Sequence, residues 1–302
     1  MPDSLSASAP GFTGETQTSP VQLTAVRARD ADELIPLIYH SPVTDTIVWD
    51  GPLSLAEFRA NLAELEEQVR RGEQHVFTLR SVPGHIASGS ARIRPDAEQV
   101  RAELGLWIGG PFQGQGYGTR GVRELVRYGF EHLKLEKIDA YVFTGNCASR
   151  RIFEKNGFSL KGTIRSALQK RGQSVDEWLF GLTRQEYFLW RDHIVHLCVR
   201  LDWESAQTLG RYQADSLQRE GFIHCSRPEQ VLDVANRFYR GVPDLLILWI
   251  DLRKLSAEVR WESADGDDFP HVYGGIDCAA VSHAASFYPD EDGFYRSFPH
   301  LG

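Results

Sequence analysis

A short glycine-rich run lies between a strand-like segment at residues 102–108 and a helix-like segment that follows it. Glycine lets backbone N–H groups come close to a phosphate, and the start of a helix adds a partial positive charge. The spacing is neither that of a dinucleotide-binding G-x-G-x-x-G run nor that of a P-loop. We therefore predict a pyrophosphate-bearing ligand, the alternative being a tight strand-to-helix turn. The predicted contact residues are Gln113, Gly114, Gln115, Gly116, Tyr117, Gly118 and Thr119.

The run itself fits a known pattern, and two further landmarks follow it in the sequence. Gln113, Gly116 and Gly118 fit the pattern Gln/Arg-x-x-Gly-x-Gly/Ala, which resembles the acyl-CoA pyrophosphate loop of the GNAT acetyltransferases. Residues 146–158 (NCASRRIFEKNGF) resemble the N-x-A-S-x-x-x-x-E-K-x-G-F element of the RimJ/RimL-like branch of that family. The last hairpin of that branch is matched by Gly162, Arg165, Gly172 and Asp176. The resemblance covers about residues 21–190.

This resemblance implies an N-acetyltransferase with acetyl-CoA as co-substrate and a primary amine as acceptor, on a protein N-terminus or a small molecule. It also implies that the fourth and fifth strands of the sheet diverge between Trp107 and Tyr141. The pantetheine arm would lie in that gap, with the thioester near Asn146 and Ser149. The further cofactor contacts that it implies are Trp107, Ile108, Asn146 and Phe153.

Acyl transfer to an amine needs a neutral nucleophile, a polarised carbonyl and a stabilised thiolate. Glu103 alternates with Leu104 on its strand and shares a face with Trp107. The resemblance implies that Glu103 accepts the amine proton; the alternative is a solvated carboxylate. Ser149 is implied as the partner of the thiolate; the alternative is a residue in the first turn of a helix capped by Asn146.

The sequence departs from many members of the superfamily at Phe153, where they carry a tyrosine that protonates the leaving thiol. Ser149 or water would then take that role. A noncatalytic acyl-CoA sensor is the alternative that this departure keeps open.

Length and composition indicate two folded cores. The chain has 302 residues, of which 42% are hydrophobic and 25% charged. A formal charge of −8 argues against nucleic acid as a partner, and the longest apolar run is far shorter than the ~20 residues that span a bilayer. Four cysteines without C-x-x-C spacing predict neither a zinc ribbon nor a disulfide scaffold, and favour a cytoplasmic location. Residues 1–20 are predicted to form a flexible tail.

Strand and helix patterns predict an α/β (α+β) protein with a mixed sheet flanked by helices at 21–190, followed by a small α+β domain at 193–302. Capping-box spacings place helix starts at Asp30 with Glu33, at Ser54 with Glu57, and at Ser226 with Glu229. The predicted strands are 21–27, 75–80, 85–93, 102–108, 138–143, 193–199, 245–251, 258–261 and 281–288. A long helix at 118–133 and a short one from Asp202 to Gly210 complete the prediction. The oligomeric state is not predicted.

Motifs in the C-terminal part resemble a small bacterial family of unassigned function that is grouped with ADP-ribosyltransferase-like folds. They include residues 221–226 (GFIHCS) and 269–274 (FPHVYG). The fold grouping implies that His196 holds a nicotinamide ribose and that Glu262 stabilises an oxocarbenium-like state, an alternative activity based on NAD. The candidate residues for this second site are His196, His224, Ser226, Glu262 and His271. The same histidines with Cys225 could bind zinc, but because no pair has zinc-site spacing we predict no metal.

Overall fold

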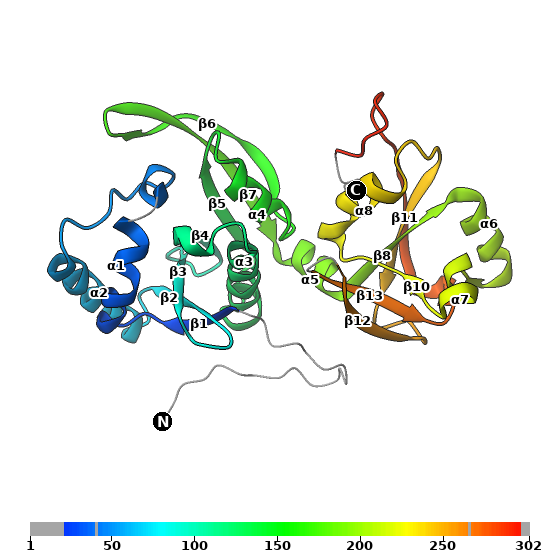
Figure 1. Cartoon of the computed structure of the whole chain (residues 1–302), viewed down its shortest axis with the longest axis horizontal. Helices are drawn as coiled ribbons and strands as arrows, with labels where there is room; N and C mark the ends of the chain where they lie inside the picture. The colour runs from blue at the N-terminus through cyan, green and yellow to red at the C-terminus, as the bar shows by residue number, and fades with distance from the viewer. Residues whose placement is uncertain (1–20, 40–41, 265–266, 297–302) are drawn as a thin grey trace.

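The computed structural model describes residues 21–39, 42–264 and 267–296. The strands of its N-terminal part are β1 (Val21–Ala25), β2 (His75–Ser81), β3 (Ala87–Pro95), β4 (Arg101–Ile108), β5 (Lys137–Phe143), β6 (Ser159–Lys170) and β7 (Gln173–Thr183). They form one sheet in the order β1-β2-β3-β4-β5-β7-β6 (Figure 1). β4 and β5 run parallel, and the other neighbours run antiparallel. The predicted mixed sheet is confirmed, and the predicted flexible tail lies outside the described residues.

Two helices, α1 (Ala31–Tyr39) and α2 (Leu55–Arg70), cover one face of the sheet. Their buried side chains, among them Leu34 and Phe58, pack against Val76 of β2. The cap predicted for α2 is confirmed, because Ser54 Oγ accepts a hydrogen bond from the backbone N–H of Glu57 at 3.1 Å. The apolar spacing and the N-cap therefore both indicate the same first residue for α2.

The capping box predicted at Asp30 and Glu33 is wrong. Asp30 ends the short 3₁₀ helix η1 (Ala28–Asp30), and its buried carboxylate accepts hydrogen bonds from Thr78 Oγ1 at 2.6 Å and from Arg80 Nη2 at 2.8 Å. Glu33 also binds Arg80, at 2.9 Å. Both carboxylates are engaged by β2, a segment distant in sequence, and local spacing cannot reveal such partners.

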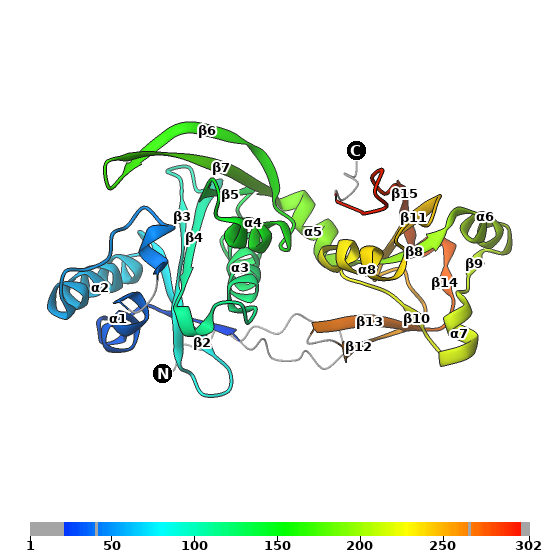
Figure 2. The ribbon, with the colours of Figure 1, turned by 45° about the horizontal axis from the view of Figure 1, so that its top comes forward.

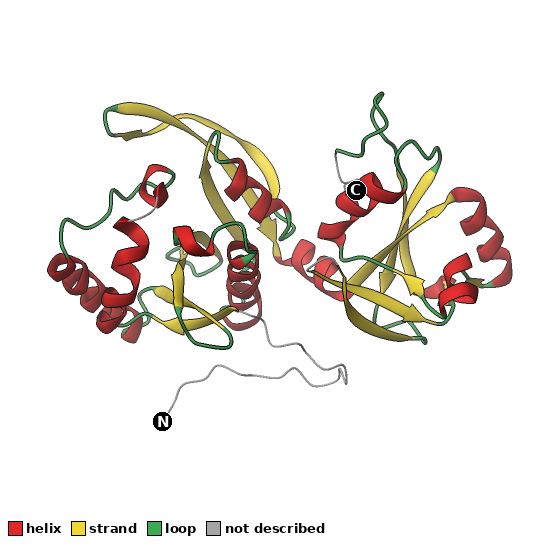
Figure 3. Ribbon diagram, in the orientation of Figure 1, coloured by secondary structure: helices red, strands yellow, loops and turns green. Residues whose placement is uncertain are grey.

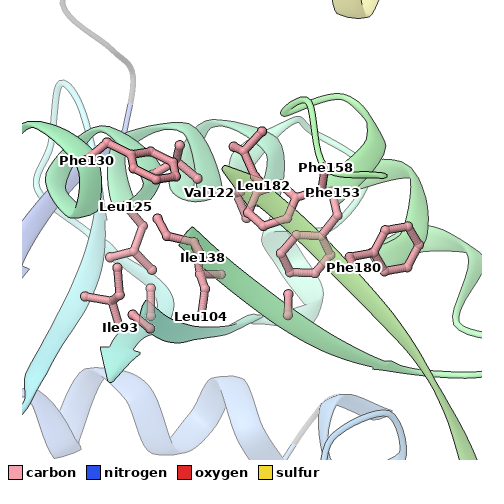
Figure 4. Packing of buried hydrophobic residues seen from close by; sticks show 14 of the residues in the cluster. Ile93, Leu104, Val122, Leu125, Phe130, Ile138, Phe153, Phe158, Phe180 and Leu182 are labelled. Carbon is pink, nitrogen blue, oxygen red and sulfur yellow. The ribbon is translucent and has the colours of Figure 1, made fainter. Parts of the chain in front are cut away.

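The opposite face of the sheet is covered by α3 (Tyr117–Arg127), by the π-helical turn η4 (Tyr128–His132) and by α4 (Cys147–Glu154). Figure 4 shows Val122, Leu125 and Phe130 of this layer lying over Leu104 and Ile138 of the strands. Because these side chains are buried, the layer forms the main core of the N-terminal part.

The β6/β7 hairpin is long and arches away from the rest of the sheet toward α1 (Figure 1). Near its tip Lys170 Nζ donates to the backbone carbonyls of Val48 and Trp49, each at 3.1 Å, and pairs with Asp50. These contacts attach the hairpin to the segment between the 3₁₀ helix η2 (Pro42–Asp45) and α2. The predicted last hairpin is thereby confirmed, with Arg165 and Asp176 forming an ion pair at 2.6 Å across its strands.

Helix α5 (Arg184–Asp192) connects the sheet to the C-terminal part (Figure 2). Its Tyr187 stacks on Phe130, with ring centroids 5.0 Å apart, while its Trp190 meets Trp249 edge to face at 6.5 Å. The helix therefore contributes side chains to both cores.

The C-terminal part contains several small sheets with helices around them (Figure 3). One sheet has the order β15-β11-β8, a second β10-β13-β12, and a third pairs β14 with β9. The strands are β8 (His193–Val199), β9 (Arg211–Tyr212), β10 (Ile223–His224), β11 (Leu245–Asp251), β12 (Glu258–Ala264), β13 (Asp267–Tyr273), β14 (Ile276–Asp277) and β15 (Val281–Phe287). The helices are α6 (Arg200–Leu209), α7 (Asp215–Glu220) and α8 (Val231–Phe238), with 3₁₀ turns η5 (Pro228–Gln230) and η6 (Cys278–Ala280).

Ser226 and the strand β13 differ from the sequence predictions, and the short elements β9, β10, β14 and α7 were not predicted. Ser226 is not a helix cap: it bridges to Val195 through two backbone hydrogen bonds of 2.8 Å, and the backbone N–H of Arg227 instead donates to Gln230 Oε1. Strand β13 was not predicted, because its sequence is polar and contains Pro270. It forms nonetheless, since β10 and β12 pair with it on both sides.

Within the described residues, no helix combines the length and the hydrophobicity that crossing a membrane would require.

Candidate functional site

The glycine-rich run forms an exposed loop between the 3₁₀ turn η3 (Gly110–Phe112) and α3. Gln113 Nε2 donates back to the carbonyl of Ile108 at 2.8 Å, and Gln115 Nε2 donates to that of Pro111 at 2.6 Å. Gly116 is the N-cap of α3 with φ of 80°, a conformation that glycine adopts without strain. The two glutamine side chains therefore brace the loop from within.

The backbone N–H groups of residues 114–119 make no hydrogen bond to any other described residue. Unpaired N–H groups at the start of a helix are suited to binding an anion, and the predicted contact with a pyrophosphate stays a prediction. Arg120 adds a positive charge, because its guanidinium lies beside Gly116, and it forms no ion pair with a described residue. Sequence analysis missed Arg120; its position directly after the glycine run was the available signal.

Gly118 has a different role from the other loop glycines. It is buried, and a Cβ atom at this position would lie 2.6 Å from Ile152 Cδ1 of α4. Gly114 and Gly116 have open space or only the end of a flexible side chain around them, with positive φ. The first two glycines thus shape the loop, and Gly118 permits the close packing of α3 against α4.

β4 and β5 pair over only three residue pairs, from Arg101–Lys137 to Glu103–Asp139. From Leu104 onward β4 has no partner on this side, as the resemblance implied. Trp107 is partly buried beside the α1/α2 cluster, and Ile108 is in the main core. Tyr141, across the gap on β5, is 43% exposed. The unpaired backbone of the two strands therefore opens toward the same end of the sheet as the glycine loop.

α4 begins beyond the end of β5. Asn146 Oδ1 accepts a hydrogen bond from the backbone N–H of Ser149 at 3.1 Å, so Asn146 is the N-cap. The Ser149 hydroxyl has no hydrogen bond to the described residues, and its role as thiolate partner stays a prediction. Phe153 is buried against Phe158 and Phe180, which favours a packing role over the predicted cofactor contact.

Glu103 lies at the last residue pair of the β4/β5 ladder. Its carboxylate pairs with Arg94 at 2.7 Å and with Arg92 at 3.2 Å, both on β3. Both carboxylate oxygens are thereby engaged by guanidinium groups. The predicted role of Glu103 as base stays a prediction, and these ion pairs do not favour it.

Glu177 of β7 is a second carboxyl group that sequence analysis missed. It is buried, and burial raises its pKa, with a further contribution from the charge of Glu103. The strand alternation of residues 173–183 could have indicated its face, but its burial depends on β5 and β6 on either side.

The structure brings together three of the five candidates in the C-terminal part. His271 Nδ1 donates to Glu262 in a short hydrogen bond, and Tyr273 Oη donates to the same carboxylate at 3.0 Å. The rings of His224 and His271 lie edge to face, with centroids 5.0 Å apart. Arg260 pairs with Glu258 at 2.8 Å, so the partners of Glu262 are His271 and Tyr273.

His196 is directed away from this cluster. Its Nδ1–H donates to the carbonyl of His224 at 2.7 Å, and Tyr212 Oη lies 3.0 Å from its Nε2. Burial lowers the pKa of His196 to about 4, so the ring is neutral at physiological pH. Within the described part of the chain, no three histidine, cysteine or carboxylate side chains are arranged to hold a metal ion.

Comparison with known proteins identifies the protein family. Residues 21–159 match the sequence model of the family described as acetyltransferase (GNAT) domain, and residues 197–284 match a family described as a protein of unknown function, DUF952. The chain belongs to the GNAT acetyltransferase family.

Individual relatives agree with this assignment. The chain is 33% identical to the uncharacterized N-acetyltransferase p20 of Bacillus licheniformis, over 30% of this chain and 52% of the relative. It is 32% identical to the SPbeta prophage-derived uncharacterized N-acetyltransferase YokL of Bacillus subtilis, over 41% of this chain and 70% of the relative. The structure of Mycobacterium smegmatis RimJ in complex with CoA-disulfide has the same fold, with a TM-score of 0.50 and 21% identity over 55% of this chain and 83% of RimJ. The chain spans about half the length of the first relatives that it matches.

Proposed function

We propose that this protein is an acetyl-CoA-dependent N-acetyltransferase that acts on a primary amine, of a protein N-terminus or a small molecule. The observation that carries the proposal is the series of free N–H groups at residues 114–119. They open beside the gap between β4 and β5, where an extended thioester arm could bond to strand backbone. Gly114, Gly116 and Arg120 would hold the pyrophosphate, and Trp107 and Tyr141 would flank the arm.

The chemistry is a direct transfer within a ternary complex. The amine nitrogen attacks the thioester carbonyl, an N–C bond forms, the C–S bond breaks, and the amine gives up a proton to a base. The CoA thiolate leaves near the N-terminus of α4, whose partial positive charge stabilises it, and Ser149 or water supplies its proton. A proposed domain boundary between residues 190 and 193 assigns this chemistry to residues 21–190, and a cytoplasmic location suits the acetyl-CoA supply.

The C-terminal part receives no catalytic role in this proposal. The His196 ring is buried and both of its nitrogens are engaged, so it has no free group for a nicotinamide ribose. Residues 193–302 are proposed as a separate small α+β domain.

The test is release of free CoA thiol by the purified full chain, from acetyl-CoA and a panel of primary amines that includes N-terminal peptides, polyamines and amino acids. Turnover with one class supports the proposal and names the acceptor. Tight binding of acetyl-CoA without turnover across the panel would replace it with the acyl-CoA sensor, and consumption of NAD would move the activity to the C-terminal part.

A further inference from the structure

Glu177 is a buried carboxyl group that has no partner among the described residues. The residue is 8% exposed, and its side chain makes no hydrogen bond or ion pair within the described chain. Burying a carboxylate without a compensating partner is costly, and such groups are kept where they have a task. Glu103 differs from Glu177 in this respect, because its carboxylate forms ion pairs with two arginines.

The strand register places Glu177 on the face of the sheet that α1 and α2 cover. Trp178, Phe180 and Leu182 alternate with it and face the main core under α3 and α4. Glu177 is paired with Phe143 of β5 and therefore shares a face with Tyr141 and Asp139 of the same strand. Asp139 is in turn paired with Glu103 of β4, so both glutamates face the side of the sheet that α1 and α2 cover.

The β6/β7 hairpin that carries Glu177 is held in place both at its base and at its tip. Its base is in the sheet, and its tip is tied to the segment before α2 by Lys170 and by Arg171, which pairs with Asp45 at 2.7 Å. Glu177 is paired with Phe143 of β5 on one side and with Ile164 of β6 on the other, so it lies where the hairpin joins the sheet. The backbone at Glu177 is held by the strands on both sides, and the residue is mostly buried while its carboxyl group has no partner in the described part of the chain, so the group is available as a proton acceptor.

Several charged groups lie on the same face of the sheet as Glu177. On the same sheet face lie Glu103 of β4, Arg92 and Arg94 of β3, and Asp139, Tyr141 and Lys137 of β5. The neighbour on β6 is the apolar Ile164. Burial raises the pKa of Glu177, and the negative charge of Glu103 raises it further, so the Glu177 carboxylate is a stronger base than a solvated one.

From this arrangement we infer that Glu177 receives the proton that the acceptor amine loses as it attacks the thioester. The assignment rests on the proposed function. The nitrogen forms its bond to the acetyl carbon, the N–H proton passes to a Glu177 carboxylate oxygen directly or through one water, and the electron pair of the breaking C–S bond leaves on sulfur. Glu103 lies on the same face of the sheet, where its carboxylate is paired with Arg92 and Arg94.

The experiment compares the full chain with Glu177→Gln, Glu177→Asp and the control Glu98→Gln, a change at an exposed turn. We expect Glu177→Gln to lower kcat/KM by about 10²- to 10⁴-fold, the usual contribution of a positioned base. Acetyl-CoA affinity should be unchanged. The rise of kcat/KM with pH at its acidic end should disappear in Glu177→Gln and return in part in Glu177→Asp. Glu98→Gln should behave as the wild type.

Two results would overturn the inference while leaving the proposed function intact. One is activity of Glu177→Gln within about threefold of the wild type, with an unchanged pH profile. The other is loss of the acidic limb only in Glu103→Gln, which would make Glu103 the base. Failure of the wild-type chain to bind acetyl-CoA would instead overturn the proposed function itself.

Discussion

Arg123 of α3 and Glu229 of η5 form an ion pair of 2.7 Å between the N-terminal and C-terminal parts of the chain. α3 is also the helix whose first turn carries the free N–H groups of the glycine loop. A weaker contact of 3.8 Å, between Lys155 and Asp233, lies beside it. The helix proposed to bind the cofactor is thereby attached to a part of the chain that has its own core.

This ion pair should contribute measurably to stability. Glu229 is mostly buried and Arg123 is 42% exposed, so solvent screening reduces the gain to about 0.5–1 kcal/mol. A double-mutant cycle with Arg123→Gln and Glu229→Gln, read by urea unfolding, should give a coupling of that size that falls when salt is added. A coupling of zero at low salt would mean that the two parts are not held together through this pair.

Gly116→Ala should weaken acetyl-CoA binding by about tenfold or more, since φ of 80° is strained for alanine and the loop must shift its N–H groups. Gly72→Ala is the matched control, because Gly72 has φ of 74°, open space around it and a position at the end of α2. Both variants should lose similar stability, and only the first should lose affinity in a calorimetric titration. Equal affinities would contradict the assignment of the loop.

Stability should fall on acidification through His196. Its folded-state pKa of about 4 lies below the ordinary value of 6.5, so the unfolded chain binds the proton more tightly. The contribution is complete above pH 6.5 and is lost as the pH falls toward 4, up to roughly 3 kcal/mol. Urea unfolding of the wild type and of His196→Asn between pH 7.5 and 4.5 measures it. A pH dependence that is the same in both proteins would show that another group is responsible.

Glu177 should affect the pH dependence of stability in the opposite direction to His196. Because its pKa is raised in the folded state, ionising it opposes folding as the pH rises above the ordinary carboxyl value. Glu177→Gln should therefore gain stability relative to the wild type between pH 4 and pH 8, while it loses activity. Thermal unfolding of the wild type and of Glu177→Gln at pH 4 and pH 8 tests this. A stability difference in favour of the variant that is smaller at pH 8 than at pH 4 would contradict it.

Much of the site was predictable because its residues are consecutive. The glycine loop, the cap at Asn146 and the turn of the last hairpin each depend on backbone geometry over a few residues, which local sequence specifies directly. Glu177 and the ion pairs of Glu103 were not predictable in this way. Their environments are made by β3, β4, β5 and β6, whose registers depend on packing between distant segments.

The sequence by itself determined the fold family, the main strands and helices of the N-terminal part, and the position of the glycine-rich loop, because periodicity, caps and glycine conformations act locally. Tertiary structure alone decided which of two glutamates is paired and which is buried without a partner, where Asp30 and Ser226 bond, and which C-terminal histidines meet. The physical reason is that burial and charge pairing depend on which residues are close in space. Those contacts form only when segments distant in sequence pack together.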